Sequence, residues 1–280
     1  MIMFKKVAII GVGLIGGSIG LAVKKKKLAQ NVIGVARRRS TLRKALRLKS
    51  VDAATLSIKK AVEKADLVII ASPVDKIVHL AGECVKFMKK GAILTDVGST
   101  KSFIVYGIEK IARGKVNFIG SHPMAGSEKN GVEHADANLF DKAPLIMTRT
   151  KNTDVKSLGK LKRFWMALGC RNLIMSPAKH DYIVSKASYL PHAVSLALTL
   201  SQTGDSMKIA AGSLKDATRV SSSDPKLWSD IFLSARKPII KSIRDFMNKL
   251  TVLDKAVRGK DRARLRRLLD KAKRSRDRIR

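Results

Sequence analysis

The stretch that decides the fold is Lys6-Val7-Ala8-Ile9-Ile10-Gly11-Val12-Gly13-Leu14-Ile15-Gly16, near the start of the chain. An apolar run typical of a strand leads into a Gly-x-Gly-x-x-Gly pattern, and a helical pattern follows it. Here Gly11 allows a tight turn, Gly13 lets the backbone approach a pyrophosphate, and Gly16 lets helix and strand pack closely. The amino end of the helix then faces the phosphates, so the stretch predicts a dinucleotide-binding fold. The predicted cofactor site comprises Gly11, Gly13, Leu14, Ile15, Gly16 and Ser72.

Outward from this stretch, strand and helix patterns alternate through the first half of the chain. Short apolar runs typical of buried strands recur at 32–35, 66–71, 92–96, 116–120 and 145–148. Such alternation predicts parallel βαβ units with right-handed crossovers. From about residue 177 the patterns are almost all helical. We therefore expect an α/β fold, with a Rossmann-type dinucleotide-binding domain over 1–174 and an all-α domain over 175–280.

Composition excludes several classes of protein. The 280 residues are 45% hydrophobic and 28% charged, so the chain can bury a real core and is not disordered. No apolar run approaches the roughly 18 residues that a membrane span needs, so no membrane association is expected. Cys84 and Cys170 are isolated in the sequence and form no metal-binding or redox pair. We expect both thiols to be buried and reduced, and the chain to be cytoplasmic.

The charge is unusual, because 57 Lys and Arg face only 22 Asp and Glu, giving +35. Such a field attracts nucleic acid, anionic membranes and acidic small molecules alike. Residues 258–280 carry twelve of these cations with leucines at helical spacing, which fits a solvated terminal helix. Aromatic residues make up only 5%, and no known nucleic-acid-binding module is present. We therefore expect a small anionic substrate and no specific nucleic-acid partner.

The end of the second predicted strand bears on the choice of cofactor. An acidic residue usually stands there to bond the ribose 2′-hydroxyl of NAD. Here Ala36 occupies that place, and Arg37 and Arg38 follow it, ahead of a helix expected to begin with Ser40 as N-cap. Guanidinium groups bind phosphate bidentately, so this pattern favours the 2′-phosphate of NADP. NAD remains the alternative, since these arginines also fit the general basic excess.

Further stretches carry side chains suited to catalysis. Asp96-Val97-Gly98-Ser99-Thr100-Lys101 and Gly120-Ser121-His122-Pro123-Met124-Ala125-Gly126-Ser127-Glu128 each follow a predicted strand. Because ligands of open α/β sheets bind beyond the carboxyl ends of the strands, Ser99 and His122 are site candidates from placement alone. The helical half adds Leu190-Pro191-His192-Ala193, Lys215-Asp216-Ala217-Thr218-Arg219 and Asp224-Pro225-Lys226-Leu227-Trp228.

At these residues the sequence resembles the prephenate/arogenate dehydrogenase family of tyrosine biosynthesis. The resemblance implies oxidative decarboxylation of prephenate to 4-hydroxyphenylpyruvate, with hydride transfer to NAD(P). Arogenate, which would give tyrosine, is the alternative substrate, and no residue here decides between the two. A β-hydroxyacid dehydrogenase-like enzyme shares the architecture, but the helical Gly-x-x-x-Asn stretch with its catalytic lysine is missing. A nucleotide-binding or nucleic-acid-binding protein without catalysis is the alternative from another class.

The resemblance also implies roles for individual residues. His122 looks like the catalytic histidine that takes or polarises the substrate hydroxyl proton, with Ser99 as its partner. Arg219 looks like the clamp for the ring carboxylate. The remaining substrate-binding candidates are His192, at the side-chain end of the substrate, and the orienting residues Asp216 and Glu128.

Three other features complete the expectations. Tyr189 stands where many relatives have a histidine, which affects pH response or pocket shape. His79, His134 and His180 are expected on the surface or in packing, and no spacing suggests a metal site. The apolar stretches 196–200 and 239–253 need a second surface to cover them, and the family forms dimers through this region. A homodimer is therefore expected.

Overall fold

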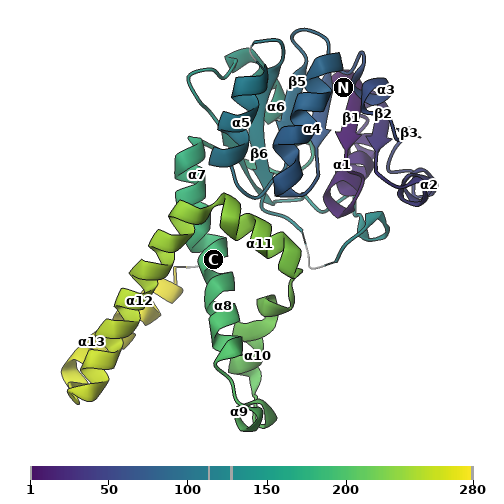
Figure 1. Ribbon diagram of the computed structural model, residues 1–280. Helices are drawn as coiled ribbons and strands as arrows, with labels where there is room; N and C mark the ends of the chain where they lie inside the picture. The colour runs from purple at the N-terminus through teal and green to yellow at the C-terminus, as the bar shows by residue number, and fades with distance from the viewer. Residues whose placement is uncertain (1, 113, 127–128, 279–280) are drawn as a thin grey trace.

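The computed structural model describes residues 2–112, 114–126 and 129–278, which form a sheet-containing domain and a helical part that projects from it (Figure 1). The eight strands are β1 Phe4–Ile10, β2 Ala29–Val35, β3 Ala53–Thr55, β4 Leu67–Ile70, β5 Ile93–Asp96, β6 Asn117–Pro123, β7 Pro144–Thr148 and β8 Arg171–Met175. They form one sheet in the order β3-β2-β1-β4-β5-β6-β7-β8. This is the doubly wound α/β architecture that the glycine stretch predicts.

One pair of strands departs from the expected parallel arrangement. β6 and β7 run antiparallel, with His122 opposite Ile146, whereas β7 and β8 are parallel again. A parallel return needs a crossover of a dozen or more residues, usually helical. The described part of the β6–β7 connection holds only the short 3-10 helix η1, Val132–His134. β6 also runs on to Pro123, so His122 lies within the strand and not in a loop beyond it.

Helices cover both faces of the sheet, and each face has its own buried apolar cluster. The helices of this domain are α1 Leu14–Lys25, α2 Arg39–Arg47, α3 Ile58–Val62, α4 Val74–Phe87, α5 Ser102–Ala112 and α6 Val155–Ala167. One cluster holds residues of α3, α4 and α5, and the other holds residues of α1, α2 and α6. The start of α2 corrects the sequence expectation, because its N-cap is Arg38 and not Ser40. No side chain caps that helix end.

The helical part begins directly after β8. Its longer helices are α7 Pro177–Val184, the π-helix η2 Ser185–Tyr189, α8 Leu190–Leu200, α11 Pro225–Ser234, α12 Arg236–Arg258 and α13 Arg262–Arg276. Shorter turns are α9 Gly204–Lys208, α10 Gly212–Thr218 and the 3-10 helix η3 Arg219–Ser222. Tyr189, Ile231 and Ile239 belong to the same buried cluster as α4 and α5. The two parts therefore share a core, and the junction between them is tightly packed.

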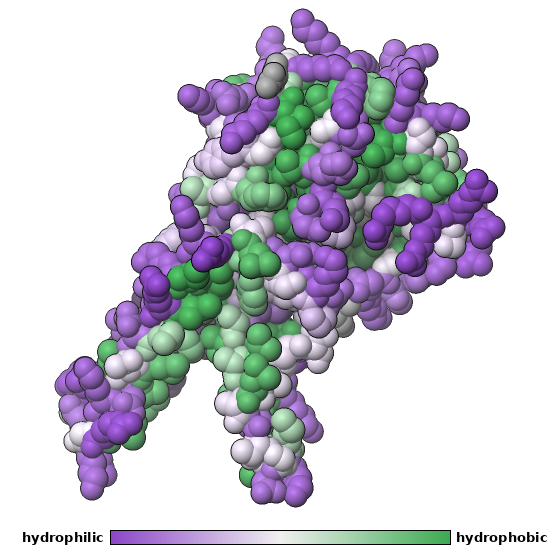
Figure 2. Space-filling view, viewed as in Figure 1, coloured by the Kyte–Doolittle hydropathy of each residue, from purple (hydrophilic) through white to green (hydrophobic). Residues whose placement is uncertain are grey.

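Two arms extend away from the sheet domain, one built from α8 to α10 and the other from α12 and α13 (Figure 1). Figure 2 shows hydrophobic residues along both arms and hydrophilic residues at their tips. Large apolar residues exposed on them include Leu196, Leu200, Met247, Leu250 and Leu253. None of the helices in the described part of the chain has both the length and the apolar character that a membrane crossing requires.

A pair of helix-interior glycines tests this packing. A Cβ on Gly20 in α1 would lie 2.0 Å from the carbonyl oxygen of Ser50, whereas a Cβ on Gly82 in α4 would meet only Ile111, at 3.9 Å. We expect Gly20→Ala to lower the free energy of unfolding by about 2 kcal/mol or more, because the backbone must move. Gly82→Ala should raise it by up to about 1 kcal/mol, since alanine favours the helix. Urea unfolding of both variants checks this, and equal effects would contradict it.

Candidate active site

The loop between β1 and α1 has the geometry that a dinucleotide phosphate requires. Gly11 has a φ of +104°, and a Cβ there would lie 2.2 Å from the carbonyl oxygen of Ala71. A Cβ on Gly16 would lie 1.9 Å from the carbonyl oxygen of Gly11, so helix and strand touch at this point. Around Gly13, in contrast, no atom lies within 4 Å of the Cβ position. The loop therefore leaves open space where a phosphate would approach the backbone.

The amino end of α1 is also electrostatically suited to an anion. Gly13 is the N-cap, no side chain bonds the first N–H groups, and the first turn has no acidic residue. These donors remain available to phosphate oxygens. Ser72, just after β4, donates its hydroxyl to the carbonyl oxygen of Ile10 at 3.2 Å, which fixes it beside the loop. The residues present thus fit a dinucleotide cofactor.

Arg37 and Arg38 are exposed at the end of β2, next to the strand that carries the glycine loop. Ala36 is partly buried against the core cluster on that side of the sheet. Neither arginine makes an ion pair with the described residues. Both guanidinium groups are therefore available to an anionic ligand at this strand end.

The loop after β5 is built on a buried ion pair. The Nζ of Lys101 lies 2.5 Å from Oδ2 of Asp96, and neither side chain is exposed. The same carboxylate oxygen accepts the backbone N–H of Gly98 at 2.8 Å. Because a buried charge is costly unless it is paired, this pairing fixes the path of the loop. Ser99, which is half-buried, is held at the turn between the two charged residues.

His122 stands at the head of a buried hydrogen-bonded chain. Its Nδ1 lies 2.8 Å from Nε2 of His180, and Nδ1 of His180 lies 2.8 Å from Oδ1 of Asp181. A carboxylate only accepts, so His180 donates from Nδ1 and accepts at Nε2. His122 therefore donates from Nδ1, and its Nε2 keeps the free lone pair of a base.

Burial sets the protonation state of the two hydrogen-bonded histidines. It lowers the pKa of His122 well below 6.5, and the neighbouring His180 and the Lys101 ammonium add to the effect. Burial also lowers the pKa of His180, although the hydrogen bond to Asp181 opposes this. Both imidazoles are thus neutral near pH 7, which is the form in which His122 can accept a proton.

Asp181 joins the two domains at the site. Its carboxylate accepts the backbone N–H groups of Lys101 and Ser102, each at 2.8 Å, where α5 begins. Tyr189 makes a second link, since its hydroxyl donates to the carbonyl oxygen of Ser99 at 2.6 Å. Burial raises the pKa of Tyr189, and the charge of Asp181 raises it further, so the hydroxyl stays a donor. Tyr189 therefore anchors the Ser99 loop.

The placement of His180 differs from the sequence expectation. His79 and His134 are exposed, but His180 is fully buried and bonds both His122 and Asp181. A lone histidine in a helix gives no hint of such a contact. The available signal was the pair His180-Asp181 near the start of α7, which follows β8 at the strand ends.

The residues that the sequence predicts to meet the substrate on the helical part lie on α8, η3 and α11. His192 stacks on Trp228, with ring centroids 3.3 Å apart and planes at 20°. Burial lowers the pKa of His192, and the charge of Arg219 lowers it further, against a hydrogen bond to the carbonyl oxygen of Ser188. Two further polar residues of α8, Ser195 and Thr199, face η3 and both hydrogen-bond the hydroxyl of Ser221, at 2.8 and 2.9 Å.

Two of the predicted substrate-binding residues lie on the surface of the single chain and not in a buried site. Arg219 and Asp216 are exposed, and neither makes an ion pair with the residues that the structure describes. Glu128 lies outside the described residues. His122, Ser99 and the glycine loop thus meet at the carboxyl edge of the sheet, while Arg219 lies beside His192 on the helical part.

Comparison with known proteins agrees with this arrangement. Residues 19–174 match the family model described as "Prephenate dehydrogenase, nucleotide-binding domain", and residues 176–271 match "Prephenate dehydrogenase, dimerization domain". The chain belongs to the prephenate dehydrogenase family. The prephenate dehydrogenase of Bacillus subtilis is 34% identical over 95% of this chain and 74% of its own length.

Solved structures of the family superpose on the whole chain. That of prephenate dehydrogenase from Aquifex aeolicus with hydroxyphenyl propionate and NAD+ has a TM-score of 0.92 and 34% identity, covering 99% of this chain and 98% of that one. Arogenate dehydrogenase from Synechocystis has a TM-score of 0.87 and 30% identity, covering 97% and 99%. The family's enzymes are dehydrogenases, and this chain is one of them.

No group of three or more His, Cys, Asp or Glu side chains that could hold a metal ion occurs among the described residues. Both cysteines are free and buried. Burial raises the pKa of Cys84 and of Cys170 to about 12, with a neighbouring carboxylate adding to the effect in each case. These thiols are therefore packing residues and not nucleophiles.

The buried histidines predict a pH-dependent stability. Their pKa values in the folded chain lie below 6.5, so in the pH window just below 6.5 the unfolded chain binds more protons. The free energy of unfolding should therefore fall as pH drops through this window, by up to about 1.4 kcal/mol per pH unit for each histidine. Urea unfolding at several pH values measures the slope. His122→Asn should make it shallower and the exposed His79→Asn should not, and the reverse result would contradict the reading.

Proposed function

We propose that the chain catalyses the oxidative decarboxylation of prephenate to 4-hydroxyphenylpyruvate, with His122 as the catalytic base. One observation carries the residue assignment. The free Nε2 of His122 ends the chain His122–His180–Asp181 at the carboxyl edge of the sheet, where the Ser99 loop and the cofactor loop also end. The Aquifex aeolicus relative with hydroxyphenyl propionate and NAD+ supports a site for a ring-bearing carboxylate beside a nicotinamide.

The proposed steps follow from the chemistry of these side chains. When bound, the nicotinamide supplies the acceptor for the hydride that leaves C4 of the substrate. Nε2 of His122 takes the proton of the C4 hydroxyl as the hydride departs, and Ser99 holds the same hydroxyl by a hydrogen bond. The C–C bond to the ring carboxylate then breaks, CO2 leaves, and its electron pair completes the aromatic ring. His122 returns its proton to the ring oxygen, so the phenol is formed without net loss of a proton.

Asp181 and His180 position the base in this scheme. The hydrogen bonds fix the ring of His122 and its tautomer, and the nearby carboxylate stabilises positive charge that develops on the imidazole pair. Arg219 is proposed to bind the ring carboxylate, where a planar fork can form two hydrogen bonds. His192, stacked on Trp228, is proposed to meet the side-chain end of the substrate, with Asp216 and Glu128 as orienting residues.

Arogenate is the second candidate substrate, because the Synechocystis relative is an arogenate dehydrogenase. Arogenate carries an amino group where prephenate has a keto oxygen. We favour prephenate, because the Bacillus subtilis and Aquifex aeolicus relatives are prephenate dehydrogenases.

The functional form is proposed to be a homodimer, built from domains spanning 1–174 and 175–280. The match to a dimerization domain over residues 176–271 supports this, as do the exposed apolar side chains on α8 and α12. We place the enzyme in the cytoplasm, where its two free buried cysteines would stay reduced.

The base assignment predicts the effect of one substitution. His122→Asn should keep cofactor binding but lose about 10²–10⁴ in kcat, because the positioned base is lost. Steady-state kinetics and cofactor fluorescence measure the two quantities. The exposed His79→Asn serves as the control, and turnover of His122→Asn within a few-fold of the unchanged chain would rule His122 out as the base.

Cofactor choice is a separate proposal. Ala36 stands where an acidic residue would repel a 2′-phosphate, so that repulsion is absent. Arg37 and Arg38 are exposed and can pair with the 2′-phosphate. We expect NADP to be preferred over NAD by at least about tenfold in kcat/KM, or roughly 1.4 kcal/mol. Ala36→Asp with Arg37→Ser should reverse the preference.

The assay uses prephenate and arogenate, each with NAD and NADP, at matched ionic strength. Faster reduction of NAD by the unchanged chain would show that the arginines do not hold a phosphate. Reduced cofactor in none of the four mixtures would remove the proposed activity itself.

The dimer is tested by mass. Light scattering at micromolar protein and moderate salt should give twice the 30.7 kDa of one chain. Salt is needed because the positive charge would otherwise hold the copies apart. Leu250→Glu, at an exposed apolar position of α12, should give the mass of one chain with unchanged helicity. A single-chain mass for the unchanged protein would contradict the proposal.

A further inference from the structure

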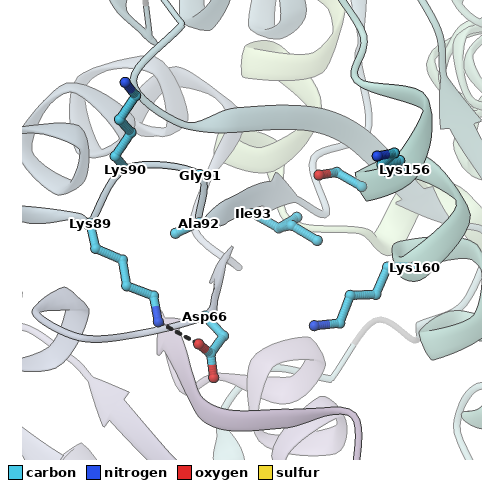
Figure 3. A pocket seen from close by; sticks show the side chains of 9 residues that line it. Asp66, Lys89, Lys90, Gly91, Ala92, Ile93, Lys156 and Lys160 are labelled. Carbon is cyan, nitrogen blue, oxygen red and sulfur yellow. Dashed lines mark hydrogen bonds and ion pairs between the residues drawn. The ribbon is translucent and has the colours of Figure 1, made fainter.

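A pocket of about 340 Å³ lies at the amino ends of β4 and β5, the edge of the sheet opposite the glycine loop (Figure 3). Three separate segments form it. Asp66 precedes β4, the turn with Lys89 and Lys90 precedes β5, and Lys156 and Lys160 lie in the first turns of α6. The glycine loop and the proposed catalytic groups lie at the carboxyl edge of the sheet. This pocket therefore has no part in the proposed reaction.

Four lysines surround a single carboxylate here, and that carboxylate is already paired. Asp66 lies 2.5 Å from Nζ of Lys89 and also accepts the backbone N–H groups of Lys5 and Lys6, at 2.7 and 3.1 Å. Burial alone would raise the pKa of Asp66, but these hydrogen bonds hold it below its ordinary value. Asp66 is therefore charged and neutralises Lys89, which leaves Lys156 and Lys160 as the lysines on the α6 wall that Asp66 does not pair.

The other lysines make no ion pair with an acidic side chain in the described part of the chain, although Asp154 lies near enough to Lys156 for their charges to interact. Lys90 and Lys156 make no ion pair there, and Lys160 lies over the ring of Phe4, 4.2 Å from its centroid. A ring face leaves the charge of an ammonium group in place. In Figure 3 the amines of Lys89 and Lys160 reach into the pocket from opposite walls, whereas Lys90 points away from it.

The wall formed by α6 is held in place. Asn117 donates from Nδ2 to the buried hydroxyl of Ser157 at 2.9 Å, which ties α6 to β6. The helix end itself does not supply the positive charge, because Asp154 already accepts the N–H of Ser157 at 2.7 Å. Attraction for an anion in this pocket comes from the lysine amines.

We propose that this lysine pocket binds a phosphate group, either inorganic phosphate or the phosphoryl group of a small metabolite. A phosphate carries up to two negative charges and three or four acceptor oxygens, so amines that arrive from opposite walls can each donate to a different oxygen. Lysine suits this role as a compact point charge. The volume lies at the lower end of the range for small-ligand pockets, which favours a small phosphate over a polymer.

The test measures binding of inorganic phosphate and of glycerol 3-phosphate by calorimetry, at fixed ionic strength. The full chain is first saturated with NADP, so that the glycine loop does not contribute. Lys156→Gln with Lys160→Gln should weaken binding at least tenfold. The matched control is Lys271→Gln with Lys273→Gln on the exposed helix α13, which removes the same charge and should change binding less than twofold. Asp66→Asn, which removes the competing carboxylate, should tighten binding severalfold.

Several results would overturn the proposal. Equal weakening in the pocket and control variants would assign binding to the overall charge of the chain. Absence of saturable binding by both probes would exclude a phosphate site, as would an oligonucleotide that binds through these lysines while the small probes do not. Because the pocket variants leave the catalytic groups untouched, their turnover should be unchanged, so this proposal and the proposed activity fail independently.

Discussion

One buried carboxylate holds together the edge of the sheet where the proposed catalytic residues lie. Asp181, on the first helix after the sheet domain, accepts two backbone N–H groups at the start of α5 and a third hydrogen bond from His180. Three donors around one carboxylate offset the cost of its burial and hold it ionised. The same contacts fix the angle between the sheet and the helical part, so the position of His122 depends on the docking of the second domain onto the first.

The site also explains why charges are buried at all. The Asp96–Lys101 pair and Asp181 carry charge into the core, and buried pairs of this kind contribute little net stability. These buried charges instead fix the positions of the loops around them. Lys101 is held by Asp96 through its side chain and by Asp181 through its backbone, so it links the two carboxylates on which the Ser99 loop and the histidine chain are built. Its ammonium group also lowers the pKa of His122, which helps to keep that imidazole neutral.

Local patterns predicted the parts of the fold that local physics determines. The roles of Gly11 and Gly16 follow from the strand-turn-helix context, and the structure leaves no room for a side chain at either position. The antiparallel direction of β7 could not be predicted from its own residues. The direction of a strand depends on the segment that connects it to the preceding strand, here the one between β6 and β7. The contact of His180 with His122 joins residues 58 positions apart, and nothing in the local sequence of either residue encodes it. The N-cap of α2 was predicted wrongly from the capping propensity of Ser40, because the helix already begins after Arg38, whose backbone is extended and whose side chain forms no capping bond.

The shortage of acidic residues makes the position of each one informative. Only 22 Asp and Glu stand against 57 Lys and Arg, and Asp96 and Asp181 are the two that are buried among the described residues. Both lie beside the proposed catalytic residues, at the carboxyl edge of the sheet. Most remaining pairs are exposed contacts within one helix, such as Lys226 with Asp230, and pairs of that kind add well under about 1 kcal/mol each. Ion pairing at the surface therefore cannot balance the +35 charge. The fold depends instead on its two apolar clusters, and on solvent ions that screen the repulsion between exposed lysines and arginines over about 8–10 Å at physiological salt.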